Sequence, residues 1–412
     1  MNREMINSGI EWIGSVPKSW KLERLQWHLE EVKESNDPIK TTQVLSLTNK
    51  LGVIPYEEKG EQGNKSKENL SEYKLAYPET IVANSMNILI GSVGLSNYFG
   101  CVSPVYYVYK GKENSNIEFY NFLFQTREFQ KELRRYANGI LEIRLRVSSN
   151  NILKRYVPIP SKEEQEKIVL LLKEKIARID ELIANQEKQI SVLKEYKKTK
   201  ITEILKTNNN QGGRLKFYLS EQMMYGANES GYAYKEGYVR YIRITDITSD
   251  GELKNNEDNQ YLPLEKAEPF LLEEGDILFA RSGGTVGKSF IYKSKEESSA
   301  FAGYLIKAKC DKTKLLPEYL YFYTQSSEYD AWKNMIFIQA TIQNIGANKY
   351  SNMPICVPSV EKQNVIIAEI VQLNKKFDEL IKIKQQKIEK LNEYKKSLIY
   401  EYVTGKREVK EG

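Results

Sequence analysis

One long segment of this chain occurs twice at a constant offset. Matched residues lie 198 positions apart, since 358 − 160 and 396 − 198 both equal 198. The matched residues are Pro160, Ser161, Gln165, Ile168, Asp180, Glu181, Leu182, Ile183, Glu195, Tyr196, Lys197 and Lys198 in the first copy, and Pro358, Ser359, Gln363, Ile366, Asp378, Glu379, Leu380, Ile381, Glu393, Tyr394, Lys395 and Lys396 in the second. A period this long indicates duplicated domains and not a solenoid. In a chain of 412 residues, each half is large enough to bury a core of its own.

Each copy predicts a long helix with a heptad seam. The first copy has neither Pro nor Gly between Ser161 and Lys206, and its apolar residues recur at spacings of three and four. The seam residues that we expect are Ile168, Leu172, Ile179, Leu182 and Leu193 in the first copy, and Ile366, Ile370, Phe377, Leu380 and Leu391 in the second. Other apolar residues would widen each stripe beyond the seam, namely Ile176, Ile183, Ile190, Ile381 and Ile388.

The two predicted helices have marked ends. A proline followed by a serine that can cap the helix stands at each start, at 160–161 and 358–359. The first helix leads into an Asn- and Gly-rich linker, and the second stops near Gly405. A single charged amphipathic helix more often packs on its own domain, but two matched heptad helices favour pairing with each other. A globular segment lies between them, so we expect an antiparallel pair, which at ~1.5 Å per residue would act as a spacer of roughly 65–70 Å.

The segment before each helix has strand character with intervening turns. We expect strands at 80–83, 88–93 and 101–109 in the first half, and at 238–244, 276–280, 288–292 and 302–308 in the second. An aromatic, helix-like segment follows in each half, at 118–125 and 318–325. The predicted fold class is therefore α+β, with two mixed α/β domains separated by an antiparallel two-helix coiled coil and related by an internal pseudo-two-fold repeat. The two halves share a plan but differ in their loops, which indicates that they recognise different things.

A glycine-rich loop at 282–289 nearly matches the phosphate-binding P-loop pattern. Its first glycine is missing, and the residues after Lys288 read as a strand where a P-loop requires a helix. A flexible β-turn is the simpler interpretation. A third interpretation is a loop whose backbone approaches a DNA phosphate or groove.

Cationic, amide and hydroxyl side chains at this loop and at comparable places are the types that contact phosphates and base edges. The candidate DNA-binding residues are Asn84, Ser85, Asn87, Arg134, Arg135, Arg144 and Arg146 in the first half, and Arg281, Ser282, Gly284, Thr285, Lys288, Gln339 and Gln343 in the second. For any one of them, a solvated surface role is an equal alternative.

Composition excludes several classes of function. The single histidine, His28, leaves no pair for a metal site, and we expect it to be structural, with no catalytic or metal residues in the chain. Three cysteines at unrelated spacings indicate a reducing compartment, and no apolar run approaches the ~20 residues of a membrane span, so we expect a cytoplasmic protein. The net charge of +6 permits nucleic-acid binding without requiring it.

The start of the chain and the ends of the repeated segments resemble a known family. Residues 9–20 read Gly-Ile-Glu-Trp-Ile-Gly-Ser-Val-Pro-Lys-Ser-Trp, and two units follow that begin with Pro-x-x-x-x-Gln and end with Glu-Tyr-Lys-Lys. Over the whole chain, this arrangement resembles the specificity (S) subunit of Type I restriction-modification systems. The first helix departs from the pattern because it lacks the Val-Thr-Gly-Lys ending found at 403–406.

The resemblance implies a domain plan and a function. It implies target-recognition domains at 1–159 and 214–357, conserved spacer helices at 160–207 and 358–406, a linker at 208–213 and a tail at 407–412. It further implies a non-catalytic subunit that reads a bipartite target in double-stranded DNA and directs adenine methylation and restriction by its partners. Those partners would be two methyltransferase (M) subunits, which use S-adenosylmethionine, and restriction (R) subunits, which use ATP and Mg, while this chain would hold no cofactor. Two alternatives are a coiled-coil scaffold that binds proteins but not DNA, and a nuclease that acts alone.

Overall fold

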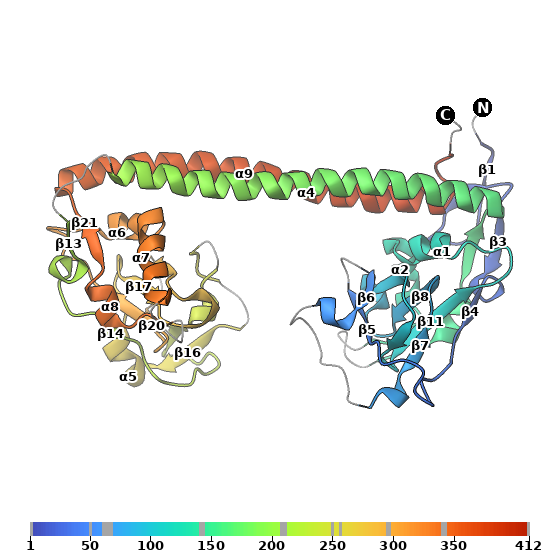
Figure 1. Ribbon diagram of the computed structural model, residues 1–412, viewed down its shortest axis with the longest axis horizontal. Helices are drawn as coiled ribbons and strands as arrows, with labels where there is room; N and C mark the ends of the chain where they lie inside the picture. Colours follow the sequence, from blue (N-terminus) through green and yellow to red (C-terminus); the bar gives the residue numbers. More distant parts are fainter. Residues whose placement is uncertain are drawn as a thin grey trace. The chain divides into compact units, whose positions relative to one another are not determined.

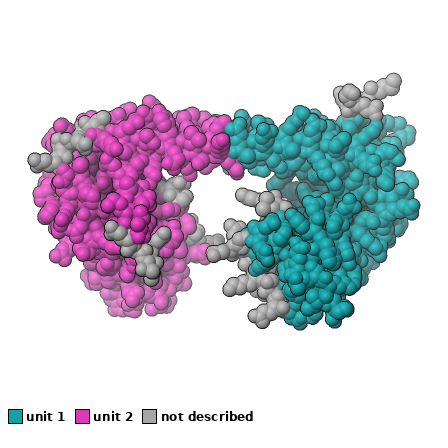
Figure 2. Space-filling model, viewed as in Figure 1, with its two compact units in different colours: residues 1–186, 386–412 teal, residues 187–385 magenta. Residues whose placement is uncertain are grey.

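A computed structural model of the chain describes residues 3–48, 52–59, 69–139, 145–206, 212–248, 251–254, 258–293, 298–338 and 344–409 (Figure 1). The chain divides into two compact units. Unit 1 consists of residues 1–186 and 386–412, and unit 2 consists of residues 187–385 (Figure 2). The two long helices, α4 (Lys162–Lys206) and α9 (Val360–Val403), each contribute one end to each unit.

Unit 1 is built on a four-stranded antiparallel sheet with the order β4-β11-β8-β9. Its strands are β4 (Leu29–Glu31), β11 (Tyr106–Gly111), β8 (Thr80–Asn84) and β9 (Val93–Ser96). Both faces of β8 are buried, and its side chains alternate between two apolar clusters. Ile81 and Ala83 pack with the helices, whereas Val82 packs with Leu45 and Val53 of a hairpin on the other face.

The remaining elements of unit 1 are short. Three paired sets of strands are β1 (Met5–Asn7) with β2 (Ser15–Pro17), β3 (Lys21–Arg24) with β12 (Tyr156–Ile159), and β7 (Lys74–Ala76) with β10 (Gly100–Val102). The hairpin is β5 (Leu45–Thr48) with β6 (Gly52–Pro55). The helices are α1 (Ile117–Phe124), α2 (Arg127–Arg134) and α3 (Ser149–Leu153), with 3-10 turns η1 (Leu25–Trp27), η2 (Tyr56–Lys59), η3 (Leu70–Glu72) and η4 (Ile88–Ile90).

Unit 2 repeats this plan with the sheet order β14-β20-β17-β18. The strands are β14 (Met224–Tyr225), β20 (Leu305–Ala308), β17 (Ile277–Ala280) and β18 (Ser289–Ile291). Ile277 and Phe279 pack with the helices, and Leu278 packs with the opposite cluster, so β17 occupies the place that β8 has in unit 1. Unit 2 also has a three-stranded sheet, β16 (Gln260–Pro263), β15 (Tyr238–Ile242) and β19 (Ser299–Phe301), and the pair β13 (Gly212–Arg214) with β21 (Pro354–Cys356). Its short helices are α5 (Leu264–Ala267), α6 (Pro317–Tyr323), α7 (Ser327–Ile338) and α8 (Ala347–Ser351), with η6 (Leu215–Tyr218), η7 (Ile244–Asp246), η8 (Glu268–Phe270) and η9 (Gly283–Thr285).

The long helices pack against each other in an antiparallel sense within each unit (Figure 1). In unit 1, Ile168 and Leu172 near the start of α4 share a core with Leu398 near the end of α9. In unit 2, Ile201 near the end of α4 shares a core with Ile366 near the start of α9. The α+β class and the pairing of two long helices, both predicted from the sequence, are confirmed.

The same ion pair forms once in each unit. The Lys395 ammonium lies 2.7 Å from a carboxylate oxygen of Asp180 in unit 1, and Lys197 lies 2.8 Å from Asp378 in unit 2. Both members of the second pair are offset by 198 residues from their counterparts in the first. The sequence repeat is therefore also a repeat of contacts. Because these side chains are partly exposed, the pairs contribute register more than stability.

The predicted seam is wrong at two equivalent positions. Leu182 and Leu380 are each 46% exposed, whereas the next residue in each copy turns inward: Ile183 packs against the core of unit 1, and Ile381 is 8% exposed. The seam therefore passes through Ile183 and Ile381, which the sequence places beside it. Ile176, also predicted to lie beside the seam, packs on the core of unit 1 as well. Of the other predicted seam residues, Ile168, Leu172, Ile179, Ile366, Ile370 and Phe377 are buried, and Leu193 and Leu391 are half-buried.

Two local predictions also differ from the structure. The segment 88–93 was expected to be a strand, but it forms η4 and then a left-handed turn at Gly91, with φ +86°, before β9 begins at Val93. Gly212 and Gly213, expected to be linker, form β13. Gly91 thus allows a tight turn inside a segment with the composition of a strand, whereas Gly212 and Gly213 form a closely paired strand in place of a flexible linker.

Candidate nucleic-acid interface

The turn between β8 and β9 is the first candidate site. Asn84 and Ser85 are 7% and 4% exposed, and they build the turn: the Asn84 side-chain oxygen accepts the Met86 backbone N–H at 3.0 Å, and the Ser85 carbonyl accepts the Val147 N–H at 3.4 Å. Asn87 is exposed at the surface of the same turn. Of these three predicted residues, Asn87 alone presents its side chain to solvent.

The equivalent turn in unit 2 lies between β17 and β18. The Arg281 carbonyl accepts the Ile345 N–H at 2.9 Å, a bond that resembles the one from Val147 to Ser85: the donors are offset by 345 − 147 = 198 residues and the acceptors by 281 − 85 = 196. The Arg281 guanidinium lies 5.1 Å from the centroid of the Tyr225 ring, and the Tyr225 hydroxyl in turn accepts the Ala347 N–H at 3.0 Å. Stacking on an aromatic ring that is itself anchored holds this cation in a defined place.

The glycine-rich part of this turn is open to solvent. Gly283 adopts φ +76°, and an added Cβ at Gly284 would meet no heavy atom within 4 Å. Ser282 and Thr285 are half-buried, and Lys288 is exposed. The short turn η9 leads into strand β18 and not into a helix, so the P-loop interpretation is wrong, because no helix start points its N–H groups at a phosphate.

The remaining predicted residues fall into different settings. Arg135 lies 2.5 Å from Glu11 and 3.2 Å from Glu132, and the bond from Arg135 lowers the pKa of Glu11, so Arg135 is paired within unit 1. Arg146 is exposed and bridges by its backbone to Asn138. Arg134 lies in the last turn of α2. Arg144, Gln339 and Gln343 lie outside the described residues.

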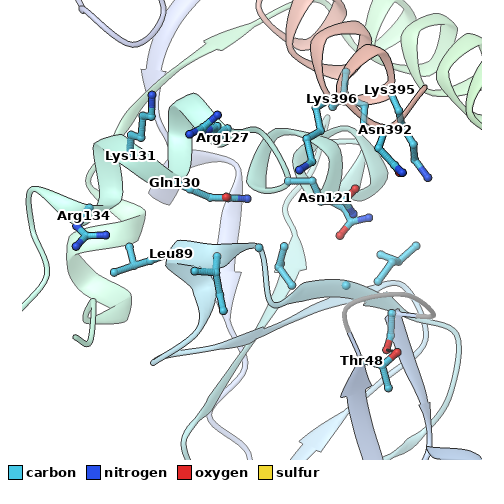
Figure 3. Close-up of a pocket in the computed structure, with 18 residues that line it drawn as sticks. Thr48, Leu89, Asn121, Arg127, Gln130, Lys131, Arg134, Asn392, Lys395 and Lys396 are labelled. Atoms are coloured by element: carbon cyan, nitrogen blue, oxygen red, sulfur yellow. Dashed lines mark hydrogen bonds between the residues drawn. The ribbon is translucent and has the colours of Figure 1, made fainter. Parts of the chain in front are cut away.

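A basic cleft adjoins the first turn, and the sequence prediction missed most of it. It has a volume of about 760 Å³ and is bounded by the β8–β9 turn, helices α1 and α2, and the last part of α9 (Figure 3). Its cationic lining consists of Arg127, Lys131, Arg134, Lys395 and Lys396. The spacing of 127, 131 and 134 places three of these on one face of α2, a pattern that could have been found in the sequence. Their convergence with α9 could not, because it depends on packing.

The histidine and the cysteines lie in settings that differ from those of metal ligands and reactive nucleophiles. It contains no group of three or more His, Cys, Asp or Glu residues that could hold a metal ion. His28 contacts Glu23 at 2.8 Å through Nε2 and stacks on Tyr120, which is the structural role expected for it. The three cysteines are free, and burial raises the pKa of the Cys310 thiol to about 12, which makes it a poor nucleophile. None of the described helices has the length and apolar character needed to cross a membrane.

Comparisons with known proteins agree with this geometry. Among curated proteins, the Type I restriction enzyme StySPI specificity subunit of Salmonella potsdam is 22% identical over 291 residues, which amount to 66% of this chain and 62% of that protein. The match therefore spans less than two thirds of that relative's length.

The chain is also similar to solved structures. A chain from a study of complex assembly and conformational transition of the type I R-M system has a TM-score of 0.67 at 14% identity, over 94% of this chain and 98% of that one. The HsdS subunit from Thermoanaerobacter tengcongensis has a TM-score of 0.44 at 14% identity, over 95% and 98% of the two chains. The first of these two matches shows a shared fold.

The match to a family is found in the second half of the chain. Residues 194–393, from the last part of α4 to the last part of α9, match the family model of the Type I restriction modification DNA specificity domain. Residues 194–393 are therefore similar to the Type I restriction modification DNA specificity domain, and the chain is similar to the specificity subunit of a Type I restriction enzyme.

Proposed function

We propose that this chain is a non-catalytic DNA-reading subunit of a Type I restriction-modification complex. The observation that carries the proposal is the pair of equivalent turns, β8–β9 and β17–β18, which share their backbone anchoring but differ in side chains. One turn presents Asn87, and the other presents Arg281 and Lys288. Amides and guanidinium groups are the groups that pair with adenine and guanine edges in the major groove. Such turns suit two readers of different sequence on a common framework.

Two readers in one chain imply a target in two parts. In our proposal each unit reads one part, and the paired helices α4 and α9 fix the gap between them. Specificity then multiplies across two modest contacts. The match of residues 194–393 to the model of a DNA specificity domain supports the reading role.

Partner subunits would carry out the chemistry. We propose two methyltransferase subunits that transfer a methyl group from S-adenosylmethionine to adenine, and restriction subunits that use ATP and Mg. Exposed apolar residues on the long helices, among them Leu170 at 72%, Val365 at 68% and Val192 at 60%, are suited to contact protein partners. These exposures also favour the alternative of a pure protein scaffold, so the two must be separated by experiment.

DNA binding as a function of salt separates the two proposals. If the chain neutralises phosphates, log K for a duplex falls linearly with log salt, by about 0.9 per phosphate contact. A scaffold that does not bind DNA would give no such dependence in the purified complex. Incubation of the isolated chain with DNA and Mg²⁺ tests for nuclease activity, and our proposal requires that the DNA stay intact.

The bipartite reading has a test of its own. Replacing residues 1–159 by the same region of a homologue with another specificity should change one half of the methylated sequence and leave the other unchanged. A change in both halves would refute independent readers. Inserting one heptad into both α4 and α9 adds about 10 Å to each helix and should widen the gap while preserving both halves. An unchanged gap would remove the spacer role.

A further inference from the structure

The basic cleft of unit 1 has an unbalanced charge. Among the 18 described residues that line it there is no Asp or Glu, while five are cationic (Figure 3). Lys395 is already paired with Asp180. Arg127, Lys131 and Lys396 are exposed, and in the described part of the chain their side chains make no ion pair. Like charges that converge without a counter-charge repel each other, and an anion that enters the cleft relieves this repulsion.

The same place in unit 2 is neutralised. Helices α1 and α2 correspond to α6 and α7 at an offset of 200, since Thr126 and Ser326 both bond to the carbonyl of the third residue before them. Gln130 of unit 1 thus corresponds to Asp330 of unit 2, and Lys396 corresponds to Lys198 at the helix offset of 198.

Asp330 binds the corresponding lysine directly. Its carboxylate pairs with Lys198 and, at 2.8 Å, with Lys333. Burial of Asp330 opposes ionisation, but the bonds from the two lysines outweigh it and lower the pKa of the carboxyl. Unit 2 therefore supplies its own counter-charge where unit 1 supplies an uncharged amide.

The cations of α2 are not needed by the shared framework. At the positions that correspond to Arg127, Lys131 and Arg134, helix α7 has an uncharged serine, alanine and asparagine at 327, 331 and 334. The same two-helix arrangement forms in both units, so packing does not explain the charge of α2. A property that belongs to one copy of a repeated fold is best explained by a ligand of that copy.

The neighbours of the cleft indicate which anion it binds. Leu89, Ile90 and Gly91 of the β8–β9 turn form one wall, so the cations lie beside the turn proposed to read bases. Asn121 projects into the cleft, and its Oδ1 is buried without a hydrogen-bond partner among the described residues (Figure 3). Lysine and arginine with amide side chains are the groups that position DNA through its phosphates. An acidic protein segment would also satisfy the charge, but nothing would then link the cleft to the reading turn.

We propose that this cleft binds the sugar–phosphate backbone of duplex DNA beside the bases read by the β8–β9 turn, and that unit 2 lacks the equivalent anchor. The inference rests on the proposed DNA-reading function. It predicts an asymmetry: the half of the target read by unit 1 is held with a steeper dependence on salt than the half read by unit 2.

The test uses the full chain with Arg127→Gln, Lys131→Gln and Lys396→Gln combined, and a fluorescent 40-bp duplex in anisotropy titrations over KCl. The salt slope should fall by about 2 to 3, that is by ~0.9 for each lost phosphate contact. When KCl rises from about 50 to about 200 mM, a slope difference of 2.7 means that the affinity of the variant for DNA falls by a factor roughly 40 times smaller than the affinity of the wild type does. The three residues are exposed, so the variant should keep the wild-type Tm.

A matched control removes three other exposed charges of unit 1, through Lys21→Gln, Lys33→Gln and Lys154→Gln. It should keep the wild-type slope. Equal slope changes in both triple variants would show a general charge effect and would overturn the cleft proposal. An unchanged slope in the cleft variant would also overturn it, whether or not that variant loses the binding of a protein partner. In a reciprocal variant, Asp330→Asn, the released lysines should steepen the slope by up to ~1. If the wild-type chain does not bind the duplex at all, the proposed function itself fails, and this result is distinct from the others.

Discussion

A buried glutamine near the start of each long helix joins that helix to its globular domain. Gln363 is fully buried; its Oε1 accepts the Leu316 N–H at 2.8 Å, and its Nε2 donates to the carbonyls of Lys314 at 2.7 Å and Pro358 at 2.8 Å. Gln165, 1% exposed, makes two such bonds, from the Asn116 N–H at 2.9 Å and to the Pro160 carbonyl at 3.1 Å. The substitution Gln→Met keeps the length of the side chain but removes these hydrogen bonds.

The expected loss follows from the count of bonds. A buried polar group left without a partner costs about 1–3 kcal/mol. We use the lower end, because the substitution also removes a polar side chain that was itself costly to bury. This gives a loss of about 3 kcal/mol of unfolding free energy for Gln363→Met and about 2 kcal/mol for Gln165→Met.

Hydrogen exchange and urea unfolding together measure this effect. The amide of Leu316 should lose protection in Gln363→Met and keep it in Gln165→Met, while the amide of Asn116 should behave in the opposite way. Asn364→Ala, at an exposed neighbouring position, is the control and should change stability by less than about 0.5 kcal/mol. The reasoning is refuted if Gln363→Met costs less than Gln165→Met, or if neither costs more than the control.

Three further predictions concern the seam, a pH dependence and a tight turn. Phe377→Ala should destabilise unit 2 by about 3 kcal/mol in urea unfolding, because the side chain is 8% exposed in the seam, whereas Leu380→Ala, at 46% exposure, should cost less than about 1 kcal/mol; equal costs would restore the original heptad assignment. Hydrogen bonds from Lys314 and Thr313 lower the pKa of Asp311 from 3.8 to about 2, so its carboxylate stabilises the fold above pH 3.8 and this contribution disappears as the pH falls to about 2. The difference in Tm between the wild type and Asp311→Asn should therefore shrink as the pH falls from 3.8 to about 2, and a constant difference would contradict this pKa assignment. Gly405→Ala should cost about 2 kcal/mol or more in urea unfolding, since φ is +71° and the new Cβ would lie 2.4 Å from Pro17, and an unchanged midpoint would argue against this contact.

The sequence predicted the elements whose signals are local. Heptad spacing and the Pro-Ser starts predicted one helix from Ser161 to about Lys206 and another from Ser359 to near Gly405, and the structure has them at Lys162–Lys206 and Val360–Val403. The strand at 80–83 and the aromatic helix at 118–125 also lie within a residue or two of β8 and α1. These signals depend on which residues are three, four or two positions apart, so they can be read without knowledge of the packing partner.

Failures arose where glycine or a partner far along the chain decided the outcome. The segment 88–93 has the apolar composition of a strand, but Gly91 in a left-handed conformation ends a 3-10 turn there. The ion pair of Arg135 with Glu11 joins residues that lie 124 positions apart, so no local pattern predicts it. Neither the backbone angle nor the pairing leaves a periodic trace in the sequence.

The amino-acid sequence by itself determined that this chain is a duplication, that each copy has a long amphipathic helix, and that the two copies share one plan. The tertiary structure alone decided which of two adjacent apolar residues, Leu182 or Ile183, enters the seam, because that choice depends on the path of the helix around its partner. It also decided that the cations of α2 meet Lys396 of α9 in one cleft, while in unit 2 a carboxylate cancels the corresponding charge. Charge balance at a site is a sum over side chains that only folding brings together.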